Sequence, residues 1–375
     1  MTERVYLDWN ATAPLCDPAR HAMMAAMDLV GNPSSVHHEG RAARALMERA
    51  RIQVAALVGA APDEVVFTSG ATEAAALAFA QATQVYPSPV EHDCVWAHGG
   101  DSRGVTGPNG ARDQVFSVGR DGAVGRGPAN DIPMDDGNGA QLFAVQAANS
   151  ETGIVQNEQN IPSAAMVCDA VQAVFRIERD WMGRADRILI SGHKFGGPKG
   201  VGALILRAGA AVPGLLPGGG QEMGRRSGTE NLVGIAGFGA AAETARRDLE
   251  DGVWDRVKEL RTILESELDR IAPEATIIGR DSPRLPNTTC VALPGWKGET
   301  QVMQMDLAGF AISAGSACSS GKVKESRVLR AMGFDAETAG SAIRVSLGPA
   351  TTEEEILRFA QAWGTAYHRH RKRAA

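Results

Sequence analysis

Short apolar runs alternate with helical segments from the N-terminus to about residue 250, and this alternation limits the fold more than any other feature. Two of these runs, 187–190 and 201–206, consist mainly of Ile, Leu, Val and Ala and flank a glycine-rich turn. Runs of this length and composition are typical of buried strands. The sequence therefore predicts an α/β fold with a mainly parallel sheet in this part of the chain. It also predicts a helix over about 38–58 that ends at Gly59, and a strand at 114–118.

The C-terminal third has a different pattern. We expect a smaller α+β domain there, made from residues 1–12 and 253–375, beside a large domain over 13–252. Thr351 and Thr352, followed by Glu354 and Glu355, fit a capping box for the last helix. The other expected elements are a charged amphipathic helix at 253–271, a helix near 300–307, and strands near 276–278, 288–293 and 342–347.

Composition and charge exclude several functional classes. The chain has 375 residues, 44% of them hydrophobic, and a formal net charge of −6. This balance gives no reason to expect binding to nucleic acid or to an anionic membrane. No apolar run reaches membrane-spanning length, and residues 1–4 do not begin a signal peptide, so we expect a cytoplasmic protein. The five cysteines are scattered without a CxxC pair, so we expect neither a metal site nor a disulfide framework.

The turn at 191–200 contains a candidate nucleophile. It holds Ser191, His193 and Lys194 between two predicted strands, with glycines on either side. Burial disfavours the ammonium form, so a sheltered lysine here is a candidate Schiff-base nucleophile. From the turn alone, a solvated lysine is an equally good interpretation, and Lys199 is an equal candidate on composition.

Polar residues follow other predicted strands. Asn149 to Glu151 and Asp169 to Gln172 come after apolar runs, and ligands of open α/β sheets bind outside such strand ends. A strand, a small-residue turn and a helix start occur at 64–73, the arrangement in which free backbone amides bind a phosphate. A simple capped helix start is the alternative there.

Taken together, ten segments resemble the motifs of the cysteine desulfurases, pyridoxal phosphate (PLP) enzymes of the class V aminotransferase group. They occur in the family's order along nearly the whole chain. The resemblance implies the type I fold of PLP-dependent transferases. The segments are YLDWNATAP (6–14), NPSSVHHEGR (32–41), FTSGATE (67–73), VEH (90–92), ANSETG (148–153), DAVQ (169–172), SGHKFGGPKGVGAL (191–204), GGGQEMGRRSGTEN (218–231), SAGSACSSG (313–321) and AIRVSLG (342–348).

The resemblance implies a site for PLP. Lys194 would hold the cofactor covalently and later carry protons at the substrate carbons, and Asp169 would pair with the pyridinium nitrogen. His92 would stack on the ring and carry protons. The other implied cofactor ligands are Gln172 and Ser150 at the phenolic oxygen (Ser150 standing where the family usually has Asn), Ala71, Thr72, Ser191 and His193 at the phosphate, and Thr229 from the neighbouring subunit of a homodimer.

The resemblance also implies the substrate side of the site. Cys318 would attack the sulfur of cofactor-bound L-cysteine, so that L-alanine leaves and a persulfide remains on Cys318. Arg344 would bind the substrate carboxylate, which suits a planar two-pronged donor, and Asn32 is a second implied substrate residue. An iron–sulfur scaffold protein is the expected sulfur acceptor. The other four cysteines are expected to be structural.

Three alternatives stay open from the sequence. A selenocysteine lyase or an aminotransferase would share most of these residues, although plain transamination needs no thiol such as Cys318. A scaffold without chemistry is the third alternative, and the presence of Lys194, Asp169, His92 and Arg344 speaks against it.

Overall fold

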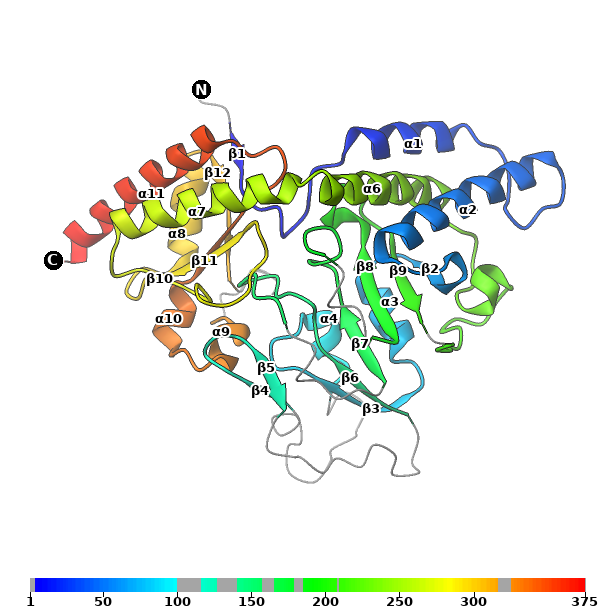
Figure 1. Ribbon diagram of the computed structural model, residues 1–375, viewed down its shortest axis with the longest axis horizontal. Coiled ribbons are helices and arrows are strands. Elements are labelled where there is room, and N and C mark those ends of the chain that lie inside the picture. Colours follow the sequence, from blue (N-terminus) through cyan, green and yellow to red (C-terminus); the bar gives the residue numbers. More distant parts are fainter. Residues whose placement is uncertain are drawn as a thin grey trace.

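The chain folds around a six-stranded sheet, with a four-stranded sheet beside it (Figure 1). The computed structural model describes residues 4–99, 116–126, 140–156, 165–178, 185–207, 209–315 and 325–374. The strands of the large sheet, in spatial order, are β2 (Val65–Thr68), β9 (Gly202–Leu206), β8 (Arg187–Ser191), β7 (Met166–Asp169), β6 (Ala140–Ala144) and β3 (Ala82–Pro87). β8, β7, β6 and β3 are parallel, and β9 is antiparallel to both of its neighbours. The mainly parallel sheet predicted from the sequence is confirmed.

Alternate residues of the large sheet face two different cores, so helices cover both of its faces. On β8, Ile188 and Ile190 belong to one hydrophobic cluster and Leu189 to the other. The first cluster includes residues of α2 (His38–Val58) and α6 (Leu232–Glu250), and the second includes residues of α3 (Ala71–Ala78). α1 (Asp17–Met27) packs along α6 on the outside (Figure 1).

Local signals fix the ends of α2. It covers 38–58 as predicted and stops at Gly59, whose φ of 65° is left-handed and favours glycine. At its start, the ring of His37 accepts the backbone N–H of Gly40. The predicted strand at 64–68 is present as β2. Of the strand predicted at 114–118, β4 (Phe116–Val118) is described and forms a hairpin with β5 (Val124–Arg126).

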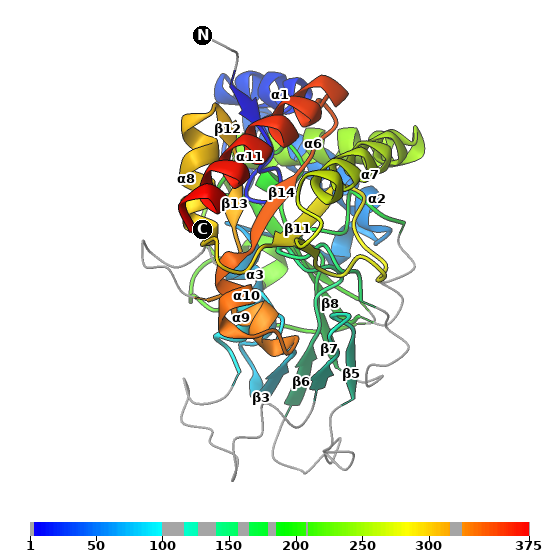
Figure 2. The same ribbon diagram turned by 90° about the vertical axis from the view of Figure 1, so that its left-hand side faces the viewer.

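The C-terminal third forms the smaller sheet and its helices (Figure 2). The capping box before the last helix is confirmed, because Thr352 and Glu355 each accept the other's backbone N–H. The elements of this region are α7 (Val253–Ile271), α8 (Gly298–Leu307), α9 (Arg327–Ala331), α10 (Ala336–Ser341) and α11 (Glu353–Ala374), with the antiparallel strands β10 (Thr276–Ile277), β11 (Thr288–Ala292), β14 (Ile343–Ser346) and β13 (Ser313–Ala314).

The N-terminal arm connects the two sheets. β1 (Val5–Tyr6) pairs with β12 (Phe310–Ala311), Asp8 bridges to Ser346, and Ala13 N–H then donates to His193 O at 2.8 Å. The arm therefore runs from the small sheet to the turn that carries Lys194. The division into domains at residues 12–13 and 252–253 stays a prediction.

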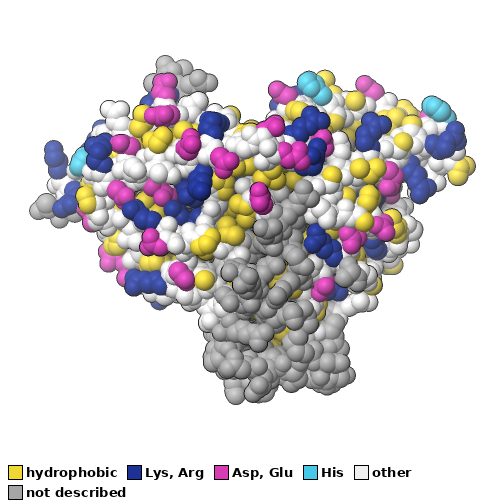
Figure 3. Space-filling view, viewed as in Figure 1, with side chains coloured by type: hydrophobic (Ala, Val, Ile, Leu, Met, Phe, Trp, Pro, Cys, Tyr) yellow, Lys and Arg dark blue, Asp and Glu magenta, His cyan; other side chains and the backbone are white. Residues whose placement is uncertain are grey.

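Charged side chains of both signs lie on the surface. On the face shown in Figure 3, basic and acidic side chains are interspersed, and the described residues form no broad basic area there. None of the helices in the described ranges combines the length and the apolar character needed to cross a membrane.

Candidate active site

A cavity of about 920 Å³ lies where the strand ends of the large sheet meet the N-terminal arm and the small sheet. Its walls come from segments far apart in the sequence, including the helix start at 70–73 and the arm at 10–12. The predicted site residues that line it are Ala71, Thr72, His92, Ser150, Asp169, Gln172, Ser191, His193, Lys194 and Arg344.

Lys194 lies in the short turn after β8, with its amine held against the N-terminal arm. Its Nζ donates to the carbonyl oxygens of Asn10 and Ala11, both at 2.9 Å. The preceding strand is buried from 188 to 191, so the turn is anchored on the core. Burial, helped by the charges of Lys194 and Lys199, lowers the pKa of His193 to about 4. His193 is therefore a neutral neighbour of Lys194 near pH 7.

Asp169 ends β7, beside the strand that leads to Lys194. Its carboxylate accepts the backbone N–H of Val171 at 3.0 Å. Burial raises the pKa of Asp169, while His92 and Lys194 act in the opposite direction. A buried carboxylate in this setting is stabilised by a cationic partner, and the protonated nitrogen of a pyridine ring is such a partner.

His92 caps the short helix α4 (Asp93–Trp96) at the cavity wall. Its Nδ1 accepts the backbone N–H of Cys94 at 3.2 Å and lies 3.1 Å from that residue's Sγ. When the ring is neutral, the proton therefore sits on Nε2. Cys94 also lines the cavity, a position that the sequence did not predict for it.

One end of the cavity suits a phosphate. α3 begins there at Ala71, and no side chain caps its N-terminus. The first backbone amides of such a helix and its dipole favour an anion. Ser191 and His193 line the same cavity. The residues predicted to bind the phosphate thus line one cavity: Ala71, Thr72, Ser191 and His193.

These features together fit PLP. The buried carboxylate of Asp169, the amine of Lys194 and the uncapped start of α3 supply partners for a ring nitrogen, an aldehyde and a phosphate within one cavity. No group of three His, Cys, Asp or Glu side chains suited to a metal ion occurs in the described part of the chain.

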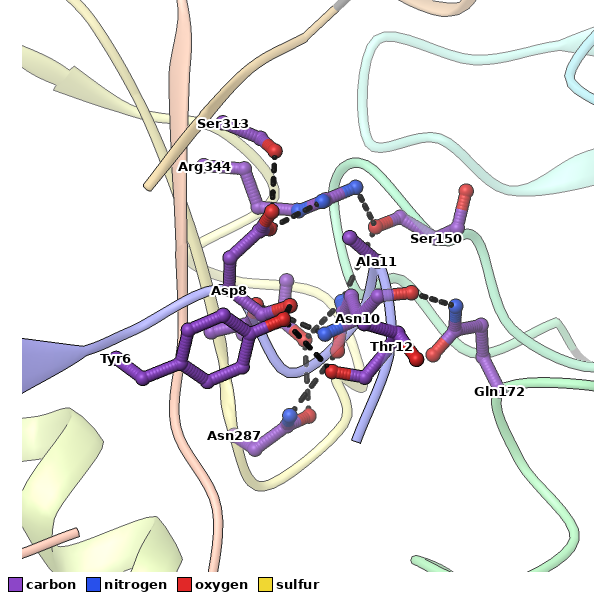
Figure 4. Close-up of polar contacts among 12 residues, drawn as sticks. Tyr6, Asp8, Asn10, Ala11, Thr12, Ser150, Gln172, Asn287, Ser313 and Arg344 are labelled. Atoms are coloured by element: carbon purple, nitrogen blue, oxygen red, sulfur yellow. Dashed lines mark hydrogen bonds and ion pairs between the residues drawn. The ribbon is translucent and has the colours of Figure 1, made fainter. Parts of the chain in front are cut away.

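Figure 4 shows that the N-terminal arm contacts Arg344 through Asp8 and Gln172 through Asn10. Arg344 donates from Nη2 to Asp8 Oδ1 at 2.6 Å and from Nη1 to the carbonyl oxygen of Ser150 at 3.1 Å. Ser313 donates to the other oxygen of Asp8 at 2.8 Å. Arg344 Nε is buried without a hydrogen-bond partner among the described residues. Asp8 thus orients the guanidinium, a role that the sequence did not reveal.

Two of the predicted site residues that the structure describes, Thr229 and Asn32, do not line this cavity. Thr229 is exposed, and its role toward a neighbouring subunit stays a prediction. Asn32 is also exposed, and its Oδ1 accepts the backbone N–H of Ser34 at 2.9 Å. Cys318 lies outside the described residues.

Glu91 carries a fully buried carboxyl group, and the sequence did not predict a role for it. Its Oε1 accepts from Ser88 Oγ at 3.0 Å and from the backbone N–H of Gln146 at 2.6 Å. No described residue donates to its Oε2. Burial, followed by the charge of Asp169, raises the pKa of Glu91 to about 8.

We expect Glu91→Gln to change how stability depends on pH. Because the carboxyl pKa is raised in the folded protein, the folded state holds a proton that the unfolded chain releases between about pH 5 and pH 8. The free energy of unfolding of the parent protein therefore falls across this window, and the variant lacks this contribution. Between about pH 5 and pH 8, the free energy of unfolding of the variant should therefore rise relative to that of the parent by on the order of a few kcal/mol.

Urea unfolding of the cofactor-free protein at about pH 5.5 and about pH 8.5 measures this difference. Glu259→Gln, at an exposed position of α7, is the control and should show no such trend. An equal pH dependence in Glu91→Gln and the parent protein would contradict the prediction.

Comparison with known proteins identifies the family of the chain. The model of the family Aminotransferase class-V matches residues 5–359. A protein named cysteine desulfurase from Cereibacter sphaeroides is 41% identical over 377 residues, covering 95% of this chain and 94% of the relative. The solved NifS-like protein from Rickettsia africae has a TM-score of 0.81 at 30% identity, covering 98% of this chain and 100% of that chain. A structure described as SspA in complex with cysteine has a TM-score of 0.69 at 26% identity, covering 93% of this chain and 100% of that one.

The chain therefore belongs to the class-V aminotransferase family. Within that family, it is similar to proteins named cysteine desulfurase.

Proposed function

We propose that the protein is a PLP-dependent cysteine desulfurase, which converts L-cysteine to L-alanine and passes the sulfur to a cysteine of its own. One observation carries this proposal: Lys194, Asp169, the uncapped start of α3 and Arg344 line a single cavity. The names of the relatives support it, as does the cysteine named for one solved structure.

Each residue has a chemical task in this proposal. When bound, PLP supplies an electron sink for the electron pair that the substrate carbon must hold. Asp169 keeps the ring nitrogen protonated, because its buried carboxylate is stabilised by a cation. Lys194 binds the cofactor's aldehyde and moves protons at the substrate carbons. Its contacts to Asn10 O and Ala11 O hold the amine at the arm.

Arg344 is the substrate's carboxylate ligand in this proposal. Its guanidinium lines the cavity, is held by Asp8 and the carbonyl of Ser150, and has an unpartnered Nε among the described residues. A planar fork of donors suits a carboxylate. We assign the thiol chemistry to Cys318 from the sequence alone. The C–S bond of cysteine breaks, an S–S bond forms on Cys318, and the substrate carbon takes up a proton.

The finer parts of the proposal concern the setting of the enzyme. We propose a cytoplasmic homodimer in which Thr229 completes the phosphate site of the neighbouring subunit. We further propose that the persulfide sulfur goes to an iron–sulfur scaffold protein.

Cys318→Ala tests the proposed reaction. We expect alanine formation from L-cysteine to fall by at least about 100-fold, because the nucleophile that accepts the sulfur is lost. PLP absorbance should stay as in the parent protein. The measurement is the initial rate of alanine formation with reductant present, beside an absorption spectrum of each protein.

Cys16→Ala, half-buried and outside the cavity, is the matched control and should retain the parent rate. Full activity of Cys318→Ala on L-cysteine would contradict the proposed mechanism. Transamination of other amino acids by both proteins would instead favour an aminotransferase.

A further inference from the structure

Arg176 carries a buried guanidinium that forms no ion pair with any acid among the residues that the structure describes. Only 2% of the residue is exposed, and its Nε and Nη2 have no hydrogen-bond partner among the described residues. Its Cζ lies over the rings of Phe175 and Trp254, 4.3 and 5.6 Å from their centroids. Burial, and then the charge of Arg344, lower the pKa of Arg176. A buried cation in such surroundings is costly and calls for an explanation.

Arg176 forms hydrogen bonds with Gln172. Its Nη1 donates to the backbone oxygen of Gln172 at 3.1 Å and also to that residue's Oε1. Backbone bonds from Val174 and Ile177 to carbonyl oxygens four residues earlier fold 170–177 into consecutive turns. These turns bring Arg176 into contact with Gln172, four residues earlier.

The second contact of the Gln172 side chain comes from the N-terminal arm. Gln172 Nε2 donates to the carbonyl oxygen of Asn10 at 2.9 Å, as Figure 4 shows. That carbonyl oxygen also accepts from Lys194 Nζ at 2.9 Å. Gln172 is therefore held between the arm and Arg176, and it lines the cavity.

The chemistry of these two neighbours permits one orientation of the amide. A guanidinium has donors and no acceptor, so the group facing Arg176 must be the amide oxygen. A carbonyl oxygen accepts and cannot donate, so the group facing Asn10 must be the NH₂. One hydrogen of that NH₂ is used by Asn10, and the second remains as a donor. Gln172 thus offers the cavity a donor rather than an acceptor.

We propose that Arg176 is a positioning residue that fixes the Gln172 amide so that its NH₂ donates to the phenolic oxygen of bound PLP. This inference rests on the proposed function, because the phenolic oxygen belongs to the cofactor. The guanidinium also polarises the amide along the hydrogen bond, which strengthens the N–H as a donor. A donor at this place favours the ionised form of the phenolic oxygen.

Two apolar replacements, Arg176→Met and Arg176→Leu, test the proposal by spectroscopy. Both remove the donors and keep an apolar contact to Phe175 and Trp254, and circular dichroism selects the variant that folds. In the PLP-loaded protein, we expect the apparent pKa of the cofactor absorbance to rise by about one unit, and the Kd for PLP to rise about fivefold. Arg176→Lys retains a donor without an acceptor and should titrate like the parent protein.

A double-mutant cycle separates positioning from a direct effect of charge. If Arg176 acts through Gln172, adding the apolar replacement to Gln172→Ala shifts the absorbance titration no further. An equal shift in both backgrounds would overturn the proposal, as would an unshifted titration in the single variants. If the parent protein does not bind PLP at all, the proposed function fails as well, so the two failures are distinguishable.

Discussion

Lys194→Ala should abolish the absorption band of the covalently held cofactor and lower alanine formation from L-cysteine by at least about 100-fold. In the proposed function, Lys194 forms the covalent bond between protein and cofactor, and it also moves protons at the substrate carbons. Its Nζ is held by two carbonyl oxygens of the arm. The measurements are an absorption spectrum after adding PLP and the initial rate of alanine formation.

Lys199→Ala is the matched control for this prediction. Lys199 lies in the same glycine-rich turn and lines the cavity, and composition alone made it an equal candidate. Its replacement should leave the absorption band in place. The opposite result, a band lost in Lys199→Ala and kept in Lys194→Ala, would move the cofactor to the other lysine.

A second consequence of removing Lys194 concerns its neighbour. The charge of Lys194, after burial, is the largest cause of the low pKa of His193. The pKa of His193 should therefore rise in cofactor-free Lys194→Ala, and NMR titration of the ring can follow it.

The parts of this structure that the sequence predicted depend on local chemistry. α2 ends before Gly59 because glycine accepts the left-handed φ. The last helix begins directly after Thr352 because the hydroxyl of Thr352 and the carboxylate of Glu355 complete a capping box. Lys194 and Asp169 line one cavity because the parallel strands that precede them end at one edge of the sheet. These signals occupy a few consecutive residues or follow from strand direction.

The parts that escaped prediction depend on contacts between distant segments. Asp8 and Arg344 are 336 positions apart, and the sequence around either residue does not predict their contact. Glu91 follows a proline-containing segment without periodicity, so its complete burial could not be read from a pattern. Arg176 lies four residues from Gln172, but its function depends on Asn10 O from the arm. Each case requires the packed structure.

Asp169→Asn should separate the stability of the protein from its chemistry. The asparagine can still accept the backbone N–H of Val171 through its oxygen, so the turn after β7 keeps its hydrogen bond. Because burial raises the pKa of Asp169, ionisation of this carboxyl group in the folded state costs stability above the carboxyl pKa of the unfolded chain. The cofactor-free variant should therefore unfold at the same or a higher urea concentration than the parent protein at pH values near 7.

The rate of alanine formation should fall in Asp169→Asn, although the stability of the protein does not. Without the carboxylate, the protonated ring nitrogen loses its buried counter-charge, and removing one partner of a buried ion pair costs about 3–5 kcal/mol. This corresponds to a rate of alanine formation at least about 100-fold lower at saturating PLP. Asp186→Asn is the matched control, since Asp186 accepts Met166 N–H at 3.2 Å at the opposite end of the same strands and does not line the cavity. A parent-like rate in Asp169→Asn, or a loss of rate explained by unfolding, would refute the pairing of this carboxylate with the cofactor ring.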